Sequence, residues 1–368
     1  MTQILAYIKP TNYCNVGCEH CYLPLSVRQN KEQMSLDTFH NTMELLVKLA
    51  IRRNADHILV LYHGGEPMMM APSKMFEYSD IVKAYSMQYG IAITESIQTS
   101  LIPFSKSWVP FIKERLGSHI GSSVDFHTRT IRGKSESYLS VWLKRVDLAR
   151  KSGITVTPGM VVTLNECGKE DEIVDWFLDN GFSHFNLERY NTYGQKLPDW
   201  PSNLEHSEFL ISLFDNLLNR IKNGEPFITN NVITAGIRGV LHGVPGDRWG
   251  GSCMSDFVVI EPNGGTNNCP DKTSFERSFS NVSSGIEEFT NSKERRGSIR
   301  IQRIDHKMSH CSSCEFNSWC KSGCPITPNG PDNGQSECSG YKKFLLHIKN
   351  YLENNIDGLK TINKYLKL

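Results

Sequence analysis

Residues 10–24 read PTNYCNVGCEHCYLP and place cysteines at positions 14, 18 and 21, directly after a short apolar run. Three thiols this close together are poorly placed to reach three separate disulfide partners. They suit one inorganic centre with several open coordination positions. Zinc is the main alternative, and His20 could then be its fourth ligand, although structural zinc sites usually take cysteines in pairs.

Composition narrows the class of protein. The chain has 368 residues, which is enough for one large α/β domain plus a smaller one or for two medium domains. It is 39% hydrophobic, which supports a hydrophobic core, and its formal net charge is +1. Near-neutral charge argues against a dedicated nucleic-acid binder. Because no apolar run reaches membrane-spanning length and the N-terminus lacks the pattern of a signal peptide, we expect a cytoplasmic protein without a membrane partner. In that reducing compartment, clustered cysteines indicate metal ligands rather than disulfides.

Short β-like runs alternate with amphipathic segments up to about residue 190. The β-like runs are residues 4–10, 57–63, 91–99, 119–125, 154–163 and 184–190, and the helical patterns are 35–54, 73–88, 136–152, 169–180 and 203–223. Six β/α units in a row predict a parallel sheet, as a partial barrel or a doubly wound sheet. In either fold the loops after the strands carry the chemistry, and the cysteine loop follows strand one.

The Cys14-x3-Cys18-x2-Cys21 loop resembles the defining motif of the radical S-adenosylmethionine (SAM) superfamily. The resemblance implies a partial (β/α)6 TIM-like barrel and a 4Fe–4S cluster whose fourth iron is open to SAM. The run HGGEP at 63–67 resembles the family's SAM-binding segment, which comprises Gly64, Gly65, Glu66 and Pro67. Its glycines allow close backbone approach, and Glu66 can accept from the SAM ammonium. A plain β-to-α turn is the alternative.

Further matches point to the sulfatase-maturase branch of that family. They imply contacts with SAM from Gln98 in SIQTS, from Ser123 to the ribose, from Arg132 to the carboxylate and from Leu187 to the adenine. A locally bonded hydroxyl and a buried strand leucine are the alternatives for Ser123 and Leu187. Ser100 and Phe126 depart from the branch, which usually has Asn and Gly there.

Seven cysteines between 253 and 338 resemble the SPASM extension of peptide-modifying radical SAM enzymes. The resemblance implies an outer auxiliary cluster on Cys311, Cys314, Cys320 and Cys338 and an inner one on Cys253, Cys269 and Cys324. Many relatives supply an eighth cysteine for the inner cluster between its first two ligands, and this sequence has none there. One iron of the inner cluster would then be open, be bound by another ligand such as Asp256, or contact the substrate. A zinc ribbon is the alternative for 311–324, and Cys167 matches nothing. We predict a barrel over 1–235, a Cys-rich SPASM domain over 236–345 and a C-terminal helix over 346–368.

The resemblance implies a radical SAM oxidoreductase with one or two auxiliary iron–sulfur clusters. Its partners would be a precursor peptide or protein and a flavodoxin or ferredoxin. Asp271 is the candidate proton acceptor, although Pro270 separates it from Cys269 and the branch has no such insertion. Four departures from the sulfatase-maturase pattern favour a peptide cross-link of the cyclophane or thioether type. They are this shift of Asp271, Ser100, Phe126 and the missing eighth cysteine. Formylglycine formation, small-molecule dehydrogenation and a non-enzymatic metal-folded protein are the alternatives. Because the first strand starts at about residue 4, we expect no N-terminal peptide-recognition domain of the kind that many such maturases carry.

Overall fold

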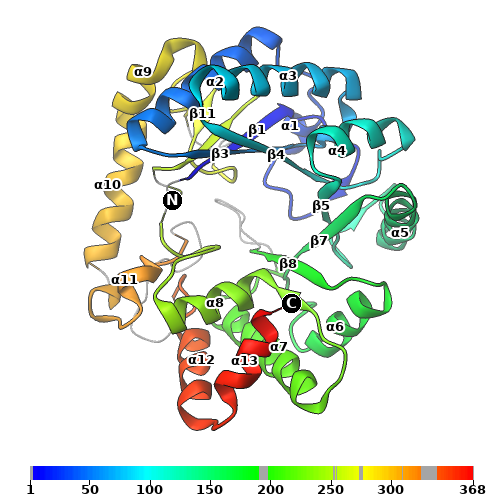
Figure 1. Ribbon diagram of the computed structural model, residues 1–368, viewed down its shortest axis with the longest axis vertical. Helices are drawn as coiled ribbons and strands as arrows, with labels where there is room; N and C mark the ends of the chain where they lie inside the picture. Colours follow the sequence, from blue (N-terminus) through cyan, green and yellow to red (C-terminus); the bar gives the residue numbers. More distant parts are fainter. Residues whose placement is uncertain are drawn as a thin grey trace. The chain divides into compact units, whose positions relative to one another are not determined.

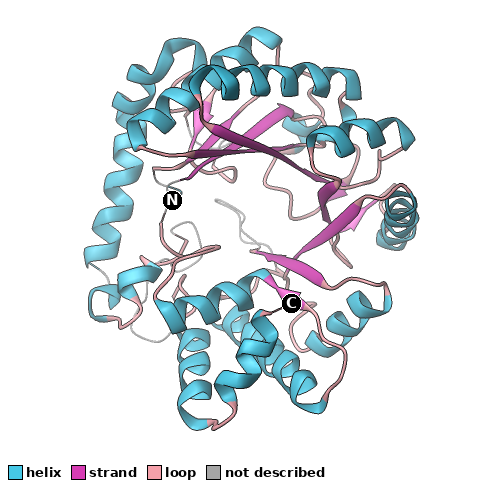
Figure 2. Cartoon of the chain, in the orientation of Figure 1, coloured by secondary structure: helices cyan, strands magenta, loops and turns pink. Residues whose placement is uncertain are grey.

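The computed structural model describes residues 3–189, 198–251, 253, 255–272, 277–308, 310–324 and 338–367. These residues divide into two compact units, each made of two separate stretches of the chain. The first unit comprises Met1–Thr157 and Cys253–Arg300, and the second comprises Pro158–Ser252 and Ile301–Leu368. The strands and helices of both are shown in Figures 1 and 2.

A mainly parallel sheet forms the centre of the first unit. Its strands lie in the order β11-β10-β1-β3-β4-β5, and all neighbours are parallel except β11 with β10. Their bounds are β1 (Gln3–Thr11), β3 (His57–Gly64), β4 (Ala92–Thr99), β5 (His119–Ser123), β10 (Phe257–Ile260) and β11 (Thr266–Asn267). The register places Tyr7 beside Leu61 and Leu61 beside Ser96. Because side chains alternate along a strand, these residues share one face of the sheet.

Helices cover the other face of this sheet (Figure 1). They are α2 (Leu36–Arg53), α3 (Pro72–Tyr89) and α4 (Val109–Arg115), with α9 (Gly285–Asn291) against α2 and α5 (Ser135–Lys151) further along the chain. Helix α2 begins where Ser35 accepts a hydrogen bond from Thr38 N, and it ends at Asn54 in the left-handed conformation. Tyr62 and Ser79 both donate to Glu95 on this covered face, at 2.6 and 2.7 Å.

The second unit packs helices around a short parallel sheet. Strand β7 (Thr155–Val161), which begins at the end of the first unit, pairs with β8 (His184–Glu188), and β8 pairs with β9 (Thr229–Asn230). Its helices are α6 (Glu170–Asp179), α7 (Asn203–Asn223), α8 (Asn231–His242), α11 (Asn317–Cys320), α12 (Lys342–Asn354) and α13 (Gly358–Leu366). Helix α10 (Lys293–Met308) contains residues of both units, because the first unit ends at Arg300 and the second resumes at Ile301.

The remaining elements are short. They are β2 (Gly17–Cys18), α1 (Leu25–Arg28), η1 (Pro67–Met69), η2 (Lys106–Trp108), β6 (Arg129–Thr130), η4 (Val282–Ser284) and η5 (His310–Ser313). Strands β2 and β6 pair antiparallel as a separate two-stranded ladder.

The α/β class with a parallel sheet is confirmed, and all six β-like runs form strands. One prediction was wrong: the C-terminal segment 346–368 is not one helix but parts of α12 and α13, separated after Asn354. The sequence also gave no indication of β10 as a partner of β1, since that pairing joins residues about 250 positions apart. The domain boundaries at 235 and 345 stay predictions.

Candidate active site

The three clustered cysteines lie on the loop after β1 and are close enough to influence one another. Burial, then the charge of Glu66, raises the pKa of Cys14 to about 12, and Cys18 and Cys21 also contribute. Burial raises the pKa of Cys18 to about 11. Binding of an iron centre removes such protons, because thiolates are its ligands. Three thiols on one loop therefore supply the ligand types that the predicted 4Fe–4S cluster requires, although among the described residues no three or more His, Cys, Asp or Glu side chains are arranged to hold a metal ion.

The two glycines at the end of β3, Gly64 and Gly65, are required by the cysteine loop. Gly65 N donates to Thr11 O at 3.1 Å, and Glu66 N donates to Tyr13 O at 2.9 Å. A Cβ on Gly65 would lie 2.2 Å from Asn12 O, and Gly64 has φ +113. Close backbone approach was predicted for the SAM ligand, whereas the described contact is with the backbone of the cysteine loop itself.

Glu66 is a buried carboxylate surrounded by donors. Its Oε1 accepts from Met68 N at 2.9 Å and from Thr99 Oγ1 at 2.6 Å, and its Oε2 accepts from Ser100 N at 2.7 Å and from the Ser100 hydroxyl. Burial raises the pKa of Glu66, and these hydrogen bonds oppose that shift. Four donors occupy about all the acceptor positions of one carboxylate. Glu66 thus joins η1, which starts at the buried Pro67, to the end of β4, and its contact with an ammonium stays a prediction.

Gln98 and Ser123 are brought together at the ends of neighbouring strands. Gln98 Nε2 donates to Ser123 Oγ at 2.9 Å. A Cβ on Gly121 would lie 2.1 Å from Gln98 Oε1, so that glycine makes room for the amide. Tyr138 OH donates to Ser123 O at 2.6 Å and fixes the backbone at this point. The two predicted SAM-contacting side chains therefore share one face of the sheet.

The two arginines of the segment after β5 have different environments. Arg132, the predicted SAM carboxylate ligand, is exposed in a turn with φ 52. Arg129, three residues earlier, has a side chain only 15% exposed and donates from Nη1 to Cys18 Sγ at 3.4 Å. Sequence spacing did not single out Arg129, because its position opposite Cys18 depends on the pairing of β2 with β6.

A buried polar cluster on the face of the sheet opposite helices α2, α3 and α4 was also missed. Lys9 Nζ lies 2.6 Å from Glu261 Oε1 and 5.0 Å from the centre of the Tyr22 ring. Glu261 Oε2 accepts from Asn12 Nδ2 at 2.9 Å, which ties β10 to the cysteine loop. Burial lowers the pKa of Lys9, while the charges of Glu261 and then Asp271 oppose this. Asp271, the predicted proton acceptor, is therefore within electrostatic reach of this cluster.

Two tyrosines and a histidine continue the cluster. Tyr22 OH donates to Gly64 O at 3.0 Å and lies 3.1 Å from Tyr7 OH. The Tyr7 ring stacks on His63 with centroids 4.4 Å apart. Burial, then the charge of Lys9, lowers the pKa of His63 to about 3, so its imidazole is neutral at physiological pH.

We expect Lys9→Met to destabilise the protein by about 3 kcal/mol, because it leaves the partly buried Glu261 without its cation. Lys9→Met/Glu261→Gln should recover part of this loss, since Gln still accepts from Asn12. Lys48→Met is the matched control, as its pair with Glu44 is exposed and should contribute nothing measurable. Urea unfolding of the three variants checks this, and equal losses for Lys9→Met and Lys48→Met would contradict it.

In the second unit, the four cysteines of the predicted outer cluster line one cavity. Its lining comprises Cys311, Cys314, Phe316, Asn317, Cys320, Ser322, Cys338, Gly340, Lys342 and Leu345. Burial, then the charge of Cys338, raises the pKa of Cys320 to about 12. Lys342 N donates to Cys338 Sγ at 3.2 Å. A Cβ on Gly340 would lie 2.6 Å from Cys320 Sγ, so a larger residue would enter the cavity. Four thiols around one space fit an iron–sulfur cluster.

Cys320→Ala should remove iron and sulfide equivalent to one cluster while the cluster on the first cysteine loop remains. The reason is that one of four ligands at this buried site is lost. Chemical analysis of iron, combined with electron paramagnetic resonance (EPR) of the reduced protein, checks the result. Undiminished iron would mean that the cavity does not hold a cluster.

The inner set of cysteines remains a prediction. Cys253 and Cys269 belong to the first unit and Cys324 to the second, and all three are partly exposed. The carboxylate of Asp256, considered as a fourth ligand, lies 2.8 Å from Arg53 Nε. Cys167 contacts Thr163 O through its sulfur at 3.5 Å and belongs to none of these groups.

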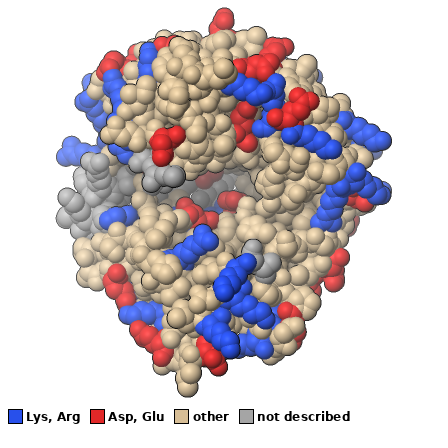
Figure 3. All heavy atoms as spheres, in the orientation of Figure 1, with Lys and Arg blue, Asp and Glu red and all other residues tan. Residues whose placement is uncertain are grey.

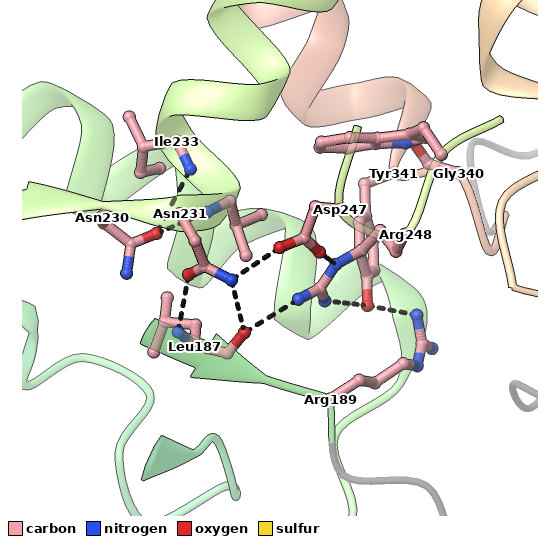
Figure 4. A network of polar contacts seen from close by, with 11 residues as sticks. Leu187, Arg189, Asn230, Asn231, Ile233, Asp247, Arg248, Gly340 and Tyr341 are labelled. Atoms are coloured by element: carbon pink, nitrogen blue, oxygen red, sulfur yellow. Dashed lines mark hydrogen bonds and ion pairs between the residues drawn. The ribbon is translucent and has the colours of Figure 1, made fainter. Parts of the chain in front are cut away.

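Leu187, the predicted adenine neighbour, is fully buried, and polar side chains hold its backbone (Figure 4). Asn231 Oδ1 accepts from Leu187 N at 2.7 Å, and Arg248 Nη2 donates to Leu187 O at 3.0 Å. Arg248 also donates to Tyr341 OH at 3.3 Å and to Asp247 at 2.9 Å. Because Tyr341 follows closely after Cys338, this network joins the end of β8 to the loop of the outer cysteines.

The surface carries both charges. Lys and Arg are interspersed with Asp and Glu on the face drawn in Figure 3. Within the described part of the chain, no helix is both long enough and apolar enough to span a bilayer.

Comparisons with known proteins agree with these features. Residues 8–177 match the Radical SAM superfamily. The chain is 24% identical to a cysteine-type anaerobic sulfatase-maturating enzyme of Clostridium novyi (strain NT), over 100% of this chain and 99% of that protein. Native anSMEcpe with bound AdoMet has a similar fold, with a TM-score of 0.78, 17% identity, and coverage of 99% of this chain and 100% of that one.

A second solved structure is similar over a smaller share of its length. Streptococcus suis SuiB bound to precursor peptide SuiA gives a TM-score of 0.61 at 17% identity, covering 88% of this chain and 72% of SuiB. At these identities the structural matches establish a common fold.

Proposed function

We propose that this chain installs an oxidative cross-link in a ribosomal peptide. The chain is a radical SAM enzyme of the SPASM maturase type, and the proposal concerns its substrate class and its product. The observation that carries the peptide part is the cavity lined by Cys311, Cys314, Cys320 and Cys338, which the chain has in addition to the three-cysteine motif at 14–21. A second iron–sulfur centre provides an acceptor for an electron taken from the substrate.

The first unit would bind SAM at the ends of its parallel strands. Cys14, Cys18 and Cys21 would hold a 4Fe–4S cluster, and Gln98 and Ser123 would supply polar contacts from one face of the sheet. When bound, the cluster and SAM supply a 5′-deoxyadenosyl radical, which takes a hydrogen atom from the substrate. Gly64 and Gly65 fix the cysteine loop by their close approach to its backbone.

Atoms and electrons balance as follows. A new bond between two side chains removes two hydrogens from the peptide, and one of them leaves in 5′-deoxyadenosine. The other would leave as a proton, for which Asp271 is the acceptor in our proposal, and an electron, for which bound auxiliary clusters would be the acceptor. Support for Asp271 is its electrostatic reach to Lys9 and Tyr22, next to the cysteine loop. A flavodoxin or ferredoxin supplies the electron that starts each cycle.

The choice of a cross-link rests on departures from the sulfatase-maturase pattern. Ser100 stands where Asn is usual, and its backbone and hydroxyl both bind Glu66. Phe126 stands where Gly is usual, and Pro270 displaces Asp271 by one position. Each change alters a part of the site that faces SAM or the substrate in our assignment.

Formylglycine formation is the second candidate, and one observation favours it. The chain corresponds over its whole length to the sulfatase-maturating enzyme, whereas it covers only 72% of SuiB. In that reaction the same hydrogen atom, proton and electron would leave a single side chain. A Ser would become the aldehyde directly, whereas a Cys would become a thioaldehyde, which water converts to the aldehyde with release of hydrogen sulfide.

Anaerobic co-expression with candidate peptides encoded beside the gene, followed by exact mass measurement, tests the proposal. A peptide that loses two hydrogens and does not react with aldehyde reagents supports a cross-link. An aldehyde-reactive product establishes the second candidate instead. If SAM is cleaved but no peptide changes mass, the peptide proposal is wrong and a small-molecule substrate is indicated. Asp271→Asn should lower product formation while leaving 5′-deoxyadenosine formation in place.

A further inference from the structure

The cysteine loop and the segment after β5 are joined by a short antiparallel ladder. Strand β2 pairs with β6, with Cys18 opposite Arg129 and Gly17 opposite Thr130. Glu19 N donates to Thr128 O at 3.0 Å and Thr130 Oγ1 donates to Gly17 O at 3.0 Å. A Cβ on Gly17 would lie 2.7 Å from Thr130 Oγ1. The ladder therefore fixes the backbone of Arg129 relative to that of Cys18.

The side chain of Arg129 reaches from this ladder to the sulfur of a cluster ligand. Its Nη1 donates to Cys18 Sγ at 3.4 Å, and its Nε binds the Asp125 carboxylate. Asp125 is 2% exposed, and the same carboxylate oxygen lies 3.6 Å from His20 Nε2. Asp125 thus orients the guanidinium, while the second arm of the guanidinium points to the thiol.

We propose that Arg129, oriented by Asp125, donates a hydrogen bond to the Cys18 thiolate of the bound 4Fe–4S cluster and so raises the reduction potential of that cluster. A donor and a positive charge at a cluster sulfur stabilise the reduced form, which carries one more negative charge. Arg129 is a positioning and tuning residue in this account. It makes the cluster easier for an external donor to reduce and a weaker reductant toward SAM.

The proposal rests on the cluster of the radical SAM domain and does not depend on the identity of the product. It predicts opposite effects from two substitutions. Arg129→Met removes the donor and the positive charge, so the potential should fall. Asp125→Asn removes a negative charge while Arg129 remains, so the potential should rise.

The test is an EPR-monitored redox titration of the reconstituted full chain, without SAM and without peptide. The signal of this cluster is identified as the one missing from a Cys14→Ala/Cys18→Ala/Cys21→Ala variant. For Arg129→Met we expect at least a tenfold lower ratio of reduced to oxidised cluster at a given potential, which corresponds to about 59 mV for one electron. Arg129→Lys should restore most of this difference. Lys134→Met removes an exposed charge from the following turn and should leave the potential unchanged.

Three results would overturn the proposal. An unchanged potential in Arg129→Met, with weaker SAM binding by calorimetry, would mean that Arg129 acts on SAM instead. A fall of the potential in Asp125→Asn would remove the charge argument. If Arg129→Met does not load iron, the decision passes to Arg129→Lys and Asp125→Asn, and unchanged potentials in both would reject the proposal. A peptide that stays unmodified in the wild type affects only the proposed function.

Discussion

Replacing Cys14, Cys18 and Cys21 together by alanine should abolish reductive cleavage of SAM, with 5′-deoxyadenosine falling below detection. The three thiols are the only protein ligands that the sequence motif offers to the SAM-binding cluster, and they lie within electrostatic range of one another on the loop after β1. Without them no iron is open to the amino acid part of SAM. The iron content should fall by about four per chain, the content of one such cluster.

The same variant should keep the clusters of the C-terminal cysteines. Four of those thiols line a cavity in the second unit, and none of the three substituted residues is part of its lining. Cys167→Ala is the matched control, because Cys167 contacts only the Thr163 carbonyl through its sulfur among the hydrogen bonds described, and it should leave both iron content and SAM cleavage unchanged. Deoxyadenosine production that persists in the triple variant would refute the assignment of the loop.

Gly65→Ala should have the second largest effect, although it adds a single methyl group. The new Cβ would lie 2.2 Å from Asn12 O and 2.5 Å from Tyr13 O, which are backbone atoms that cannot rotate away. Relief requires the cysteine loop to move as a whole, with loss of the hydrogen bonds from Gly65 N and Glu66 N. We expect a destabilisation of about 3 kcal/mol or more and poor incorporation of the first cluster.

Gly297→Ala provides the comparison for that experiment. Gly297 lies in α10, and apart from its chain neighbours and the backbone of its own helix, a Cβ there would meet no atom of the described residues within 4 Å. Alanine is the better helix former, so this change should be neutral or stabilising by about 0.5–1 kcal/mol. Thermal unfolding of the apo proteins and iron analysis after reconstitution separate the two glycines. Similar iron content in Gly65→Ala and the wild type would show that the loop adapts to the methyl group.

Local signals in the sequence were sufficient for most of the secondary structure. Helix α7 begins and ends as predicted, because Ser202 and Glu205 form a capping box and Gly224 ends the helix in the left-handed conformation. Strands β1 and β3 were visible as apolar runs. The cysteines of the outer set were predicted from the resemblance to the SPASM extension, and the structure places all four around one cavity.

Contacts between distant parts of the chain could not be predicted in this way. Glu261 is 252 positions from Lys9 and was not noticed, since an isolated Glu in a loop carries no pattern. Arg132 was predicted as a SAM ligand from the resemblance, and Arg129 was not considered, because its position opposite Cys18 depends on the β2–β6 ladder. Ser100 was taken only as a departure from a motif, whereas its two hydrogen bonds to Glu66 give it a positive role.

The ion pair of Lys9 with Glu261 also sets an order of events during synthesis of the chain. Lys9 leaves the ribosome early, but its carboxylate partner follows 252 residues later, together with β10, the neighbour of β1. At roughly 5–20 residues per second, this interval is on the order of 10–50 s. During that time the lysine has no partner from β10, and the edge of β1 that later pairs with β10 is uncovered. The first unit can therefore close only after translation has passed the loop that follows β10, well after its own N-terminal half has emerged.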